Sequence, residues 1–418
     1  MLDLKLIREN PEKVKENTAR KNEKADIDRI LALDEKRRAT IQEADELKNQ
    51  RNVVSQEIAK LKKDKMDAAD RIEAMKEVSQ RIKSLDEELR ETEQEMDYLL
   101  KTVPNMLHES VPVGKGEAEN VIVHTHGTQK ENIDKNHIDI AKMLRIIDFE
   151  RGAKVSGAGF VYYVGLGARL ERALINFMLD RHVENHGYTE MMMPYMVGRD
   201  AMTGTGQLPK MEEDMYRTED DNLYMIPTAE VPLTNFHSGE TLKDADLPIK
   251  FCGFSPCFRR EAGSYGKEVH GFLRLHQFHK VELVKFVRPE DSWDELESLT
   301  REAEQILIDL GLPYRRLVLS SGDTSFASAK TYDLEVWSPG EQKWLEVSSC
   351  SNFVDFQARR ANIRFKRDPK SKPEFVHTLN GSGLATPRIM VAILENYFEG
   401  ERVRIPDVLL EYFPHQYI

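Results

Sequence analysis

The sequence predicts an α+β protein in which an N-terminal antiparallel helical hairpin precedes a domain built on an antiparallel sheet flanked by helices. Two observations predict this fold class. From Asp26 to Thr102 the chain contains neither glycine nor proline, and its apolar side chains recur at steps of three and four, the spacing of a coiled coil. From Gly152 onward, strand-like and helix-like patterns alternate without the regular helix after every strand that marks a parallel sheet.

Length and composition indicate more than one domain. The chain has 418 residues and 40% hydrophobic residues, enough to build a core. We expect an N-terminal domain over residues 1–102, a connector over 103–150 and a second domain over 151–418. The net charge of −12 excludes a generally basic protein, so a phosphate backbone must meet a local basic patch.

Three cysteines without a disulfide framework, and an N-terminus without the apolar core of a signal peptide, predict a cytoplasmic protein. No apolar run reaches the roughly 18 residues of a membrane span, so we expect no membrane contact.

The first 25 residues begin with a short helix, for which Asn10 is a suitable cap and Pro11 a suitable first residue. The arm at about 26–102 follows. One of its stripes comprises Ala44, Leu47, Arg51, Val54, Ile58 and Leu61, and the other Met75, Val78, Ile82, Leu85, Leu89, Thr92, Met96 and Leu99.

These two stripes allow two structures. One is a single long helix that pairs with another chain, and the other is a hairpin folded back at about residues 64–69. The polar segment between the stripes lies near the midpoint, which favours the hairpin. Pro104 then ends the second helix. The tip carries Lys60, Lys62, Lys63 and Lys65. Such charges are usually a solvated surface, but here they could also bind RNA phosphates.

Beyond the connector, residues 168–186 have the pattern of an amphipathic helix, followed by Gly187 and a short run that ends in Pro194. Residues 293–310 predict another helix, which Gly311 stops.

The stretch from Phe254 to Val284 reads FSPCFRREAGSYGKEVHGFLRLHQFHKVELV and carries the strongest functional pattern. Two apolar runs flank a polar loop at 262–271 that contains Gly263 and Gly266, which predicts two antiparallel strands joined by a long loop. Guanidinium groups at strand ends bind phosphate oxygens, and an aromatic ring in a strand can stack on a base. A nearby carboxylate suits an ammonium group, so the pattern predicts a nucleotide beside an amino substrate.

This stretch resembles the second signature motif of class II aminoacyl-tRNA synthetases, and in particular that of bacterial-type seryl-tRNA synthetases. The matching segments are FRREAG at 258–263 and RLHQFHKVE at 274–282. A plain hairpin with a charged rim is the alternative, which so many matched positions at fixed spacing disfavour. The helical arm resembles the one with which that family holds the long variable arm of its tRNA.

Four further segments are similar to the same family. Thr228-Ala229-Glu230 resembles its TAE element, and NGSGLA at 380–385 with Arg388 resembles the third class II motif. There the glycines would permit a tight turn from strand to helix, and Arg388 would open the helix. LEVSSCSN at 345–352 matches as well. Residues 168–194 look like the first motif, which implies a homodimer through this region.

The resemblance implies a serine–tRNA ligase that activates L-serine with ATP and transfers it to the terminal adenosine of tRNA(Ser), and of tRNA(Sec) where present. It implies that Arg259 and Arg388 are catalytic. The implied serine-binding residues are Thr228, Ala229, Glu230, Arg259, Glu282 and Ser382. Those for ATP are Arg259, Arg260, Glu261, Phe278, Glu346, Val347, Ser348, Ser349 and Arg388, and those for tRNA are Lys60, Lys62, Lys63 and Lys65.

In the implied reaction Arg259 meets the α-phosphate and the serine carboxylate, and Arg388 holds the γ-phosphate. Glu261 faces the adenine amino group and Phe278 stacks on the ring. Mg²⁺ prefers oxygen ligands, which Glu346 and Ser349 would supply. Because these two residues are three apart, they can share one side of a strand only at a bulge or a strand end.

Other patterns predict no site. His182 and His186 have the spacing of a helical zinc pair but lack the protease pattern, so we expect no zinc. Cys252 and Cys257 lack a second pair and fit core thiols, and the glycines at 157 and 159 lack the third glycine of a dinucleotide loop.

Some residues depart from the family pattern. Thr386-Pro387 precedes Arg388 where the family usually has Gly, although proline is acceptable at a helix start. Arg260 stands where a small polar residue is common, and His270 where the family often has Arg. Two rival functions remain: loading an amino acid onto a carrier protein, which the arm argues against, and an inactive RNA-binding homologue, which the presence of both motif arginines argues against.

Overall fold

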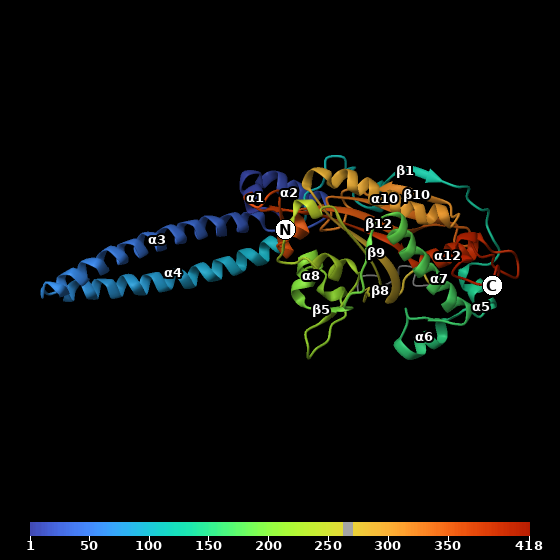
Figure 1. Ribbon diagram of the computed structural model, residues 1–418, viewed down its shortest axis with the longest axis horizontal. Coiled ribbons are helices and arrows are strands. Elements are labelled where there is room, and N and C mark those ends of the chain that lie inside the picture. Colours follow the sequence, from blue (N-terminus) through green and yellow to red (C-terminus); the bar gives the residue numbers. More distant parts are fainter. Residues whose placement is uncertain (262–270) are drawn as a thin grey trace. The chain divides into compact units, whose positions relative to one another are not determined.

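The computed structural model describes residues 1–261 and 271–418, which form two compact units (Figure 1). One unit comprises residues 2–19 and 23–104. The other comprises residues 1, 20–22 and 105–418. The predicted loop at 262–271, with Gly263, Gly266 and His270, lies outside the described residues except for Gly271.

The first unit is a helical hairpin preceded by short helices. In place of one initial helix there are two, α1 (Leu4–Glu9) and α2 (Pro11–Arg20), with Asn10 ending the first and Pro11 opening the second. The helices α3 (Ile27–Lys63) and α4 (Ala69–Lys101) then run antiparallel (Figure 1). Cross-helix ion pairs join residues near opposite ends of the two helices, such as Arg29 with Glu95 and Arg71 with Glu57. The hairpin prediction is therefore confirmed.

The second unit is built on an eight-stranded sheet in the order β1-β10-β11-β12-β15-β9-β8-β4. All neighbours are antiparallel except β4, which pairs parallel with β8 at one edge. In that order the strands span Val121–His126, Tyr314–Val318, Lys330–Ser338, Lys343–Val354, His377–Ala385, Gln277–Val287, Ile249–Phe258 and Thr189–Glu190. The predicted antiparallel sheet is confirmed.

The long helices α7 (Leu166–Asp180), α10 (Ser292–Asp309) and α12 (Thr386–Asn396) share one hydrophobic core with this sheet (Figure 1). The helix predicted at 168–186 is α7 followed by one wider turn at Arg181–Asn185, and the one predicted at 293–310 is α10. Gly187 and Gly311 follow them with positive φ angles of 72° and 64°, a conformation that glycine adopts without strain.

Smaller elements complete the unit. The helices α8 (Arg199–Thr205), α9 (Glu230–Asn235) and α11 (Phe356–Ala361) contribute to two further apolar clusters. The remaining helices are α5 (His137–Met143) and α6 (Phe149–Ser156), and the remaining strands are β2 (Ile147–Asp148), β3 (Tyr162–Tyr163), β5 (Met196–Val197), β6 (Tyr224–Met225), β7 (Thr241–Lys243), β13 (Arg364–Lys366) and β14 (Glu374–Phe375). Among the described residues, no helix combines the length and apolarity that crossing a membrane requires.

The glycines of NGSGLA do not form the tight turn that the sequence predicts. Gly381 and Gly383 lie inside β15, which runs to Ala385 and passes directly into α12. An added Cβ would come within 2.4 Å of Leu299 at Gly381 and within 2.7 Å of His182 at Gly383. These glycines therefore allow neighbouring side chains to approach the strand closely.

Candidate active site

Most of the predicted site residues line one cavity of about 630 Å³ in the second unit. Its walls come from the facing ends of β8 and β9, from β12 and β15, and from the first turns of α9 and α12. The predicted residues that line it are Thr228, Glu230, Arg259, Glu261, Phe278, Glu346, Val347, Ser349, Ser382 and Arg388. A cavity of this volume accommodates a small-molecule substrate with a cofactor-sized partner.

One wall of the cavity rests on a buried carboxylate. Glu282 is fully buried on β9, and its oxygens accept hydrogen bonds from Oγ1 of Thr228 (3.1 Å) and Nδ2 of Asn380 (2.9 Å). Lys280 forms an ion pair with Glu282 and donates to Oγ1 of Thr228 at 3.0 Å. Glu282 itself lies behind the lining, so it acts on the cavity through Thr228 and Lys280, which do line it.

A second carboxylate at this wall is held closer to its neutral form. Glu230 opens α9, is 6% exposed, and accepts a 2.6 Å hydrogen bond from Nε2 of Gln357. Burial, and then the nearby charge of Glu282, raise the pKa of Glu230 to about 7. A cationic ligand at this wall would favour the ionised form of Glu230.

A cation and an aromatic ring lie at the end of β8. Arg259 directly follows the strand, its Nε donates to the carbonyl of Pro227 at 3.3 Å, and its guanidinium lies over the ring of Phe278 on β9. The ring and the guanidinium both line the cavity. This pair offers an aromatic surface for a base and a cation for a phosphate.

Two more arginines border the same cavity. Arg388 lies in the first turn of α12, where Nε donates to the carbonyl of Leu273 (3.3 Å) and Nη1 to that of Glu346 (2.7 Å). Arg274 pairs with Glu261 at 2.9 Å across the ends of the segment outside the described residues. The cavity thus collects three guanidinium groups, the expected surroundings of a polyphosphate.

The predicted irregularity in β12 is confirmed. On the facing strand β11, Leu334 and Glu335 are consecutive, but their partners on β12 are Ser348 and Glu346, so Val347 is an extra residue. This bulge allows Glu346 and Ser349 both to line the cavity. Nearby, Oδ1 of Asp333 is buried and has no hydrogen-bond partner among the described residues, and burial followed by the charge of Glu346 raises its pKa well above the usual range.

The other predicted binding residues lie near the cavity without lining it. Arg260 is exposed and donates to the carbonyl of Glu213 at 3.2 Å. Ala229 is buried in an apolar cluster, and Ser348 donates to the carbonyl of Ser382 at 2.7 Å. Their predicted roles stay predictions.

The predicted tRNA-binding lysines lie in the first unit. Lys60, Lys62 and Lys63 occupy the last turn of α3, Lys65 lies in the connecting turn, and all four side chains are exposed. Asp64 and Asp67 share this turn, so its positive charge is partly offset.

Sequence reasoning missed Lys280 and Asn380. Both line the cavity and both bind Glu282. A signal was present: side chains two apart in a strand share a face, so Lys280 lies with Phe278 and Glu282 on β9, and Asn380 with Ser382 on β15.

The histidines and cysteines for which the sequence predicted no site are hydrogen-bonded or buried. Nδ1 of His182 lies 3.0 Å from Nδ1 of His186, and its Nε2 lies 3.1 Å from the carbonyl of Gly383. Burial lowers the pKa of His182 to about 4, so the ring is neutral. All three cysteines are free and buried, as expected of core thiols.

Two family descriptions match the chain. Residues 1–107 match the seryl-tRNA synthetase N-terminal domain, and residues 212–397 match the tRNA synthetase class II core domain shared by the G, H, P, S and T enzymes. The first match covers the helical hairpin, and the second covers most of the residues that line the cavity.

Similar proteins extend over the whole chain. The serine–tRNA ligase of Chloroherpeton thalassium is 56% identical over 99% of this chain and 98% of its own, and that of Geobacillus sp. strain WCH70 is 58% identical over the same shares. Among solved structures, seryl-tRNA synthetase from Pyrococcus horikoshii complexed with ATP superposes with a TM-score of 0.93 at 40% identity, covering 100% of this chain and 99% of that one.

Proposed function

The chain belongs to the seryl-tRNA synthetase family, and from that membership we propose that it is an ATP-dependent ligase that joins L-serine to tRNA. A serine carboxylate oxygen attacks the α-phosphorus of ATP, pyrophosphate leaves, and seryl adenylate forms. A hydroxyl of the terminal adenosine of tRNA then attacks the seryl carbonyl carbon, and AMP leaves. Neither step needs a nucleophilic side chain, so positioning and charge neutralisation supply the catalysis.

The observation that supports this proposal most directly is that the cavity has one acidic wall and one cationic wall. Glu230 and Thr228, with the buried Glu282 behind them, form one wall, and arginines with an aromatic ring form the other. The acidic wall suits an ammonium group beside a small hydroxyl, and the cationic wall suits a nucleoside triphosphate.

At the acidic wall, the ammonium of serine pairs with Glu230, and the serine hydroxyl meets Thr228 and Ser382, with Glu282 behind Thr228. The support is that Thr228 and Lys280 are already held by Glu282. Preorganised polar groups disfavour alanine, because its methyl group lies against polar atoms without forming the hydrogen bond that a serine hydroxyl forms.

At the cationic wall, Arg259 lies between the two substrates. Its contact with the Pro227 carbonyl brings it next to Thr228, and its guanidinium lies over Phe278. Arg259 therefore neutralises charge that develops on the α-phosphate. Phe278 stacks on adenine, Glu261 accepts from its amino group, and Arg388 binds the γ-phosphate.

We extend the proposal to Mg²⁺ at Glu346 and Ser349. The donor set fits, because the bulge brings oxygens of both residues to the cavity and the buried Oδ1 of Asp333 nearby lacks a hydrogen-bond partner among the described residues. When bound, Mg²⁺ would neutralise phosphate charge there. Arg388, 3.6 Å from the Glu346 carboxylate, orients that side chain.

The helical hairpin supplies the tRNA contact in this proposal. It contains none of the cavity residues, and its exposed lysines meet RNA phosphates. The seryl family description covers the hairpin, which supports this role.

We also propose a homodimer through residues 168–194. Met192 is 91% exposed and follows β4, an edge strand of the main sheet. An exposed apolar side chain beside an open strand edge suits an interface. The three free thiols fit a reducing compartment such as the cytoplasm.

The function is tested by charging bulk tRNA with labelled serine and ATP, followed by sequencing of the acylated tRNA. We expect serine on tRNA(Ser), and on tRNA(Sec) where it is present. Serine bound to a carrier protein but not to tRNA would favour the carrier-loading alternative, and no serine transfer at all would favour an inactive homologue.

A further inference from the structure

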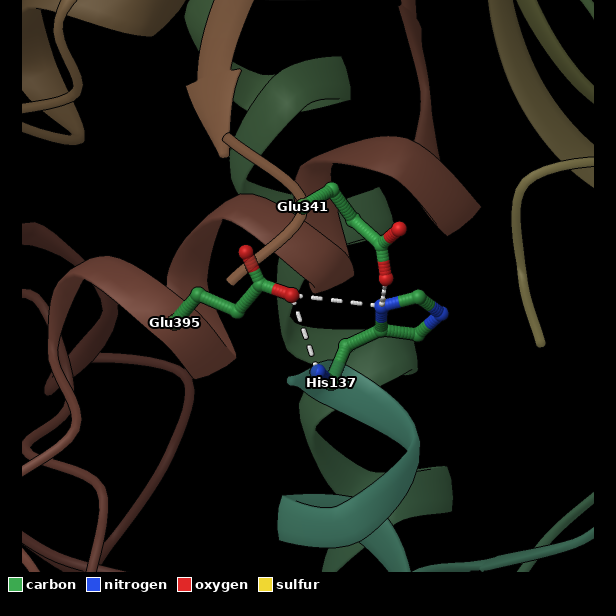
Figure 2. Close-up of side chains that lie close together, drawn as sticks. All are labelled: His137, Glu341 and Glu395. Carbon is green, nitrogen blue, oxygen red and sulfur yellow. Dashed lines mark hydrogen bonds and ion pairs between the residues drawn. The ribbon is translucent and has the colours of Figure 1, made fainter. Parts of the chain in front are cut away.

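His137 is a buried histidine outside the cavity that faces two carboxylates. It is the first residue of α5 and is fully buried. Figure 2 shows its Nδ1 facing both acids, at 3.2 Å from Glu395 on α12 and 3.3 Å from Glu341. The histidine thus connects α5 to the helix that carries Arg388.

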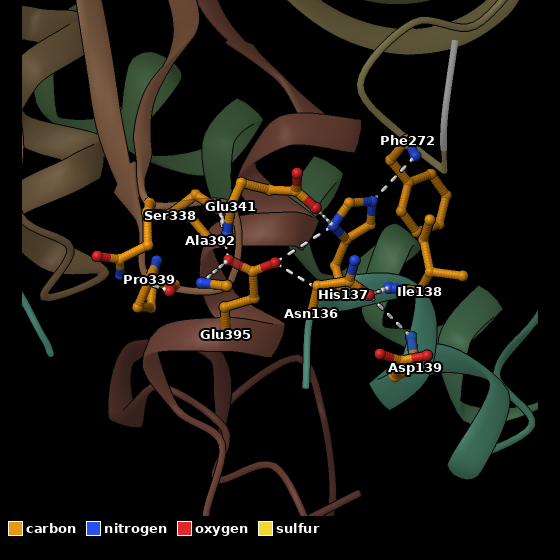
Figure 3. A network of polar contacts seen from close by, with 12 residues as sticks. Asn136, His137, Ile138, Asp139, Phe272, Ser338, Pro339, Glu341, Ala392 and Glu395 are labelled. Carbon is orange, nitrogen blue, oxygen red and sulfur yellow. Dashed lines mark hydrogen bonds and ion pairs between the residues drawn. The ribbon is translucent and has the colours of Figure 1, made fainter. Parts of the chain in front are cut away.

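Glu395 is held firmly around this contact. Its Oε1 accepts from the backbone N–H of His137 at 2.9 Å, and its Oε2 accepts from the N–H of Gly340 at 2.9 Å and from the hydroxyl of Ser338 (Figure 3). Burial acts to raise the pKa of Glu395, but the hydrogen bonds from His137, Ser338 and Gly340 outweigh it and the pKa is lowered. Glu395 is therefore an ionised acceptor for an Nδ1–H of His137.

The other ring nitrogen faces the backbone at Phe272. The N–H of Phe272 donates to Nε2 of His137 at 3.4 Å, a long hydrogen bond in a buried setting (Figure 3). Gly271 has a φ of +63°, and a Cβ there would come within 2.2 Å of Nε2. Only glycine allows the backbone to approach the imidazole this closely.

The cluster of His137, Glu341 and Glu395 could be a metal site or a set of hydrogen bonds that connects α5 to α12, and these contacts distinguish the two. The three ligand atoms of His137, Glu341 and Glu395 lie within 4.8 Å of one another, which would suit a metal ion. However, an N–H pointing at Nε2 requires a lone pair there, so the ring proton is on Nδ1. A protonated Nδ1 cannot ligate a metal, and the cluster is a hydrogen-bonded link.

The link ends at the cavity. Leu273 and Arg274, which directly follow Phe272, line the cavity, and the Leu273 carbonyl accepts from Arg388. The helix α12 therefore holds this backbone at two points, through Arg388 near its start and through Glu395 and His137 near its end. Both contacts fix the position of Arg274 relative to Arg388.

We propose that His137 is a positioning residue for ATP binding, which uses its Nε2 to fix the backbone at Phe272 against α12. This inference rests on the proposed ATP site. His137 contacts no lining side chain that we assign to serine, so its effect is expected on ATP alone.

Two substitutions distinguish the roles of the two ring nitrogens of His137. In His137→Asn the amide nitrogen can replace Nδ1 and keep the bond to Glu395, but the acceptor for Phe272 is lost. In His137→Gln the amide oxygen can replace Nε2 and keep that acceptor. His377→Asn is the control for loss of a ring, because His377 binds Ser292 and does not line the cavity.

The measurement is serine-dependent ATP–pyrophosphate exchange, with hydrogen exchange of the peptide that contains Phe272. For His137→Asn we expect the KM for ATP to rise about fivefold to tenfold, the loss of one hydrogen bond, with the KM for serine within about twofold. Amide protection at Phe272 should fall in His137→Asn and persist in His137→Gln and His377→Asn.

Equal increases in both KM values, or unchanged protection at Phe272 in His137→Asn, would overturn the proposal. Hydrogen exchange does not depend on activity, so it tests His137 separately from the proposed function. If the unsubstituted chain performs no serine-dependent exchange, the proposed function fails. If the chain and His137→Asn both perform exchange with the same KM for ATP, only the proposed role of His137 is excluded.

Discussion

The guanidinium of Arg259 lies over the aromatic ring of Phe278, with Cζ 5.2 Å from the ring centroid. Arg259 directly follows β8, and Phe278 lies on β9, where Cys257 and Phe278 are directly paired. The strand pair therefore sets their distance. Because Nε of Arg259 also donates to the Pro227 carbonyl, this cation lies between the ring proposed to stack on adenine and the wall proposed to bind serine.

Arg259→Ala should lower pyrophosphate exchange by about a hundredfold to a thousandfold, because it removes a donor aimed at charge that develops on the α-phosphate. Arg402→Ala is a matched control, since Arg402 is exposed, contacts Glu399 and the ring of Tyr417, and does not line the cavity. Exchange within a few-fold of normal in a folded Arg259→Ala protein would remove the assignment.

Glu282→Gln should raise the KM for serine by about tenfold or more and leave the KM for ATP within about threefold. The amide keeps the volume and part of the hydrogen bonding to Thr228 and Asn380 but removes the negative charge that suits an ammonium. Glu282→Ala should also destabilise the fold, because it leaves Lys280 buried without its partner. Equal changes in both KM values for Glu282→Gln would indicate a structural role.

Glu230 should make stability depend on pH. Its pKa is raised from 4.5 to about 7 in the folded chain, so the folded state binds the proton more tightly than the unfolded state does. The resulting stabilisation is complete below about pH 4.5 and is lost as the pH rises through about 7. Thermal unfolding of the chain and of Glu230→Gln, followed from pH 5 to pH 8, should show the chain losing stability relative to the variant. Parallel curves would contradict the raised pKa.

Glu230 should also couple serine binding to the release of protons. An ammonium near Glu230 favours the carboxylate, so serine binding near pH 7 should release protons. Calorimetry in buffers of different ionisation enthalpy measures this release, which Glu230→Gln should reduce. A release unchanged in the variant would assign the proton to another group.

The elements with strong periodicity were predictable from sequence. Two apolar stripes separated by a polar segment near the midpoint of the arm predicted the hairpin, because an amphipathic helix must pack its apolar stripe against another element. The spacing of Glu346 and Ser349 required the bulge that the register of β11 and β12 contains.

Side chains that act through long-range contacts were not predictable in this way. The glycines of NGSGLA indicated a turn, but their real constraint is the approach of Leu299 and His182 from other elements. His137 and Glu395 are 258 residues apart, and no local pattern shows that they meet. Lys280 could have been found from its strand spacing to Glu282, because residues two apart share a face.

Deleting about residues 30–97 should leave serine-dependent pyrophosphate exchange largely intact and abolish tRNA charging. The deleted segment contains no residue that lines the cavity. The measurement compares exchange with charging in the same preparation. Normal charging with an unchanged KM for tRNA would assign the hairpin to another role, such as partner binding.

Replacing Lys60, Lys62, Lys63 and Lys65 with Gln should weaken tRNA binding and flatten its dependence on salt, because each phosphate contact releases counterions. The matched control replaces Lys36 and Lys48, which are paired with acids across the hairpin, by Gln. Equal salt slopes for the chain and the tip variant would exclude phosphate contacts at the tip.

The proposed roles of all these residues require that the cavity activates serine. ATP–pyrophosphate exchange by the full chain, measured with serine, alanine, threonine and glycine in turn, tests it most directly. We expect exchange with serine and discrimination against alanine by about a thousandfold or more in kcat/KM, because the methyl group of alanine forms no hydrogen bond with the polar wall at Thr228. Comparable exchange with alanine, or exchange driven by another amino acid in place of serine, would contradict it.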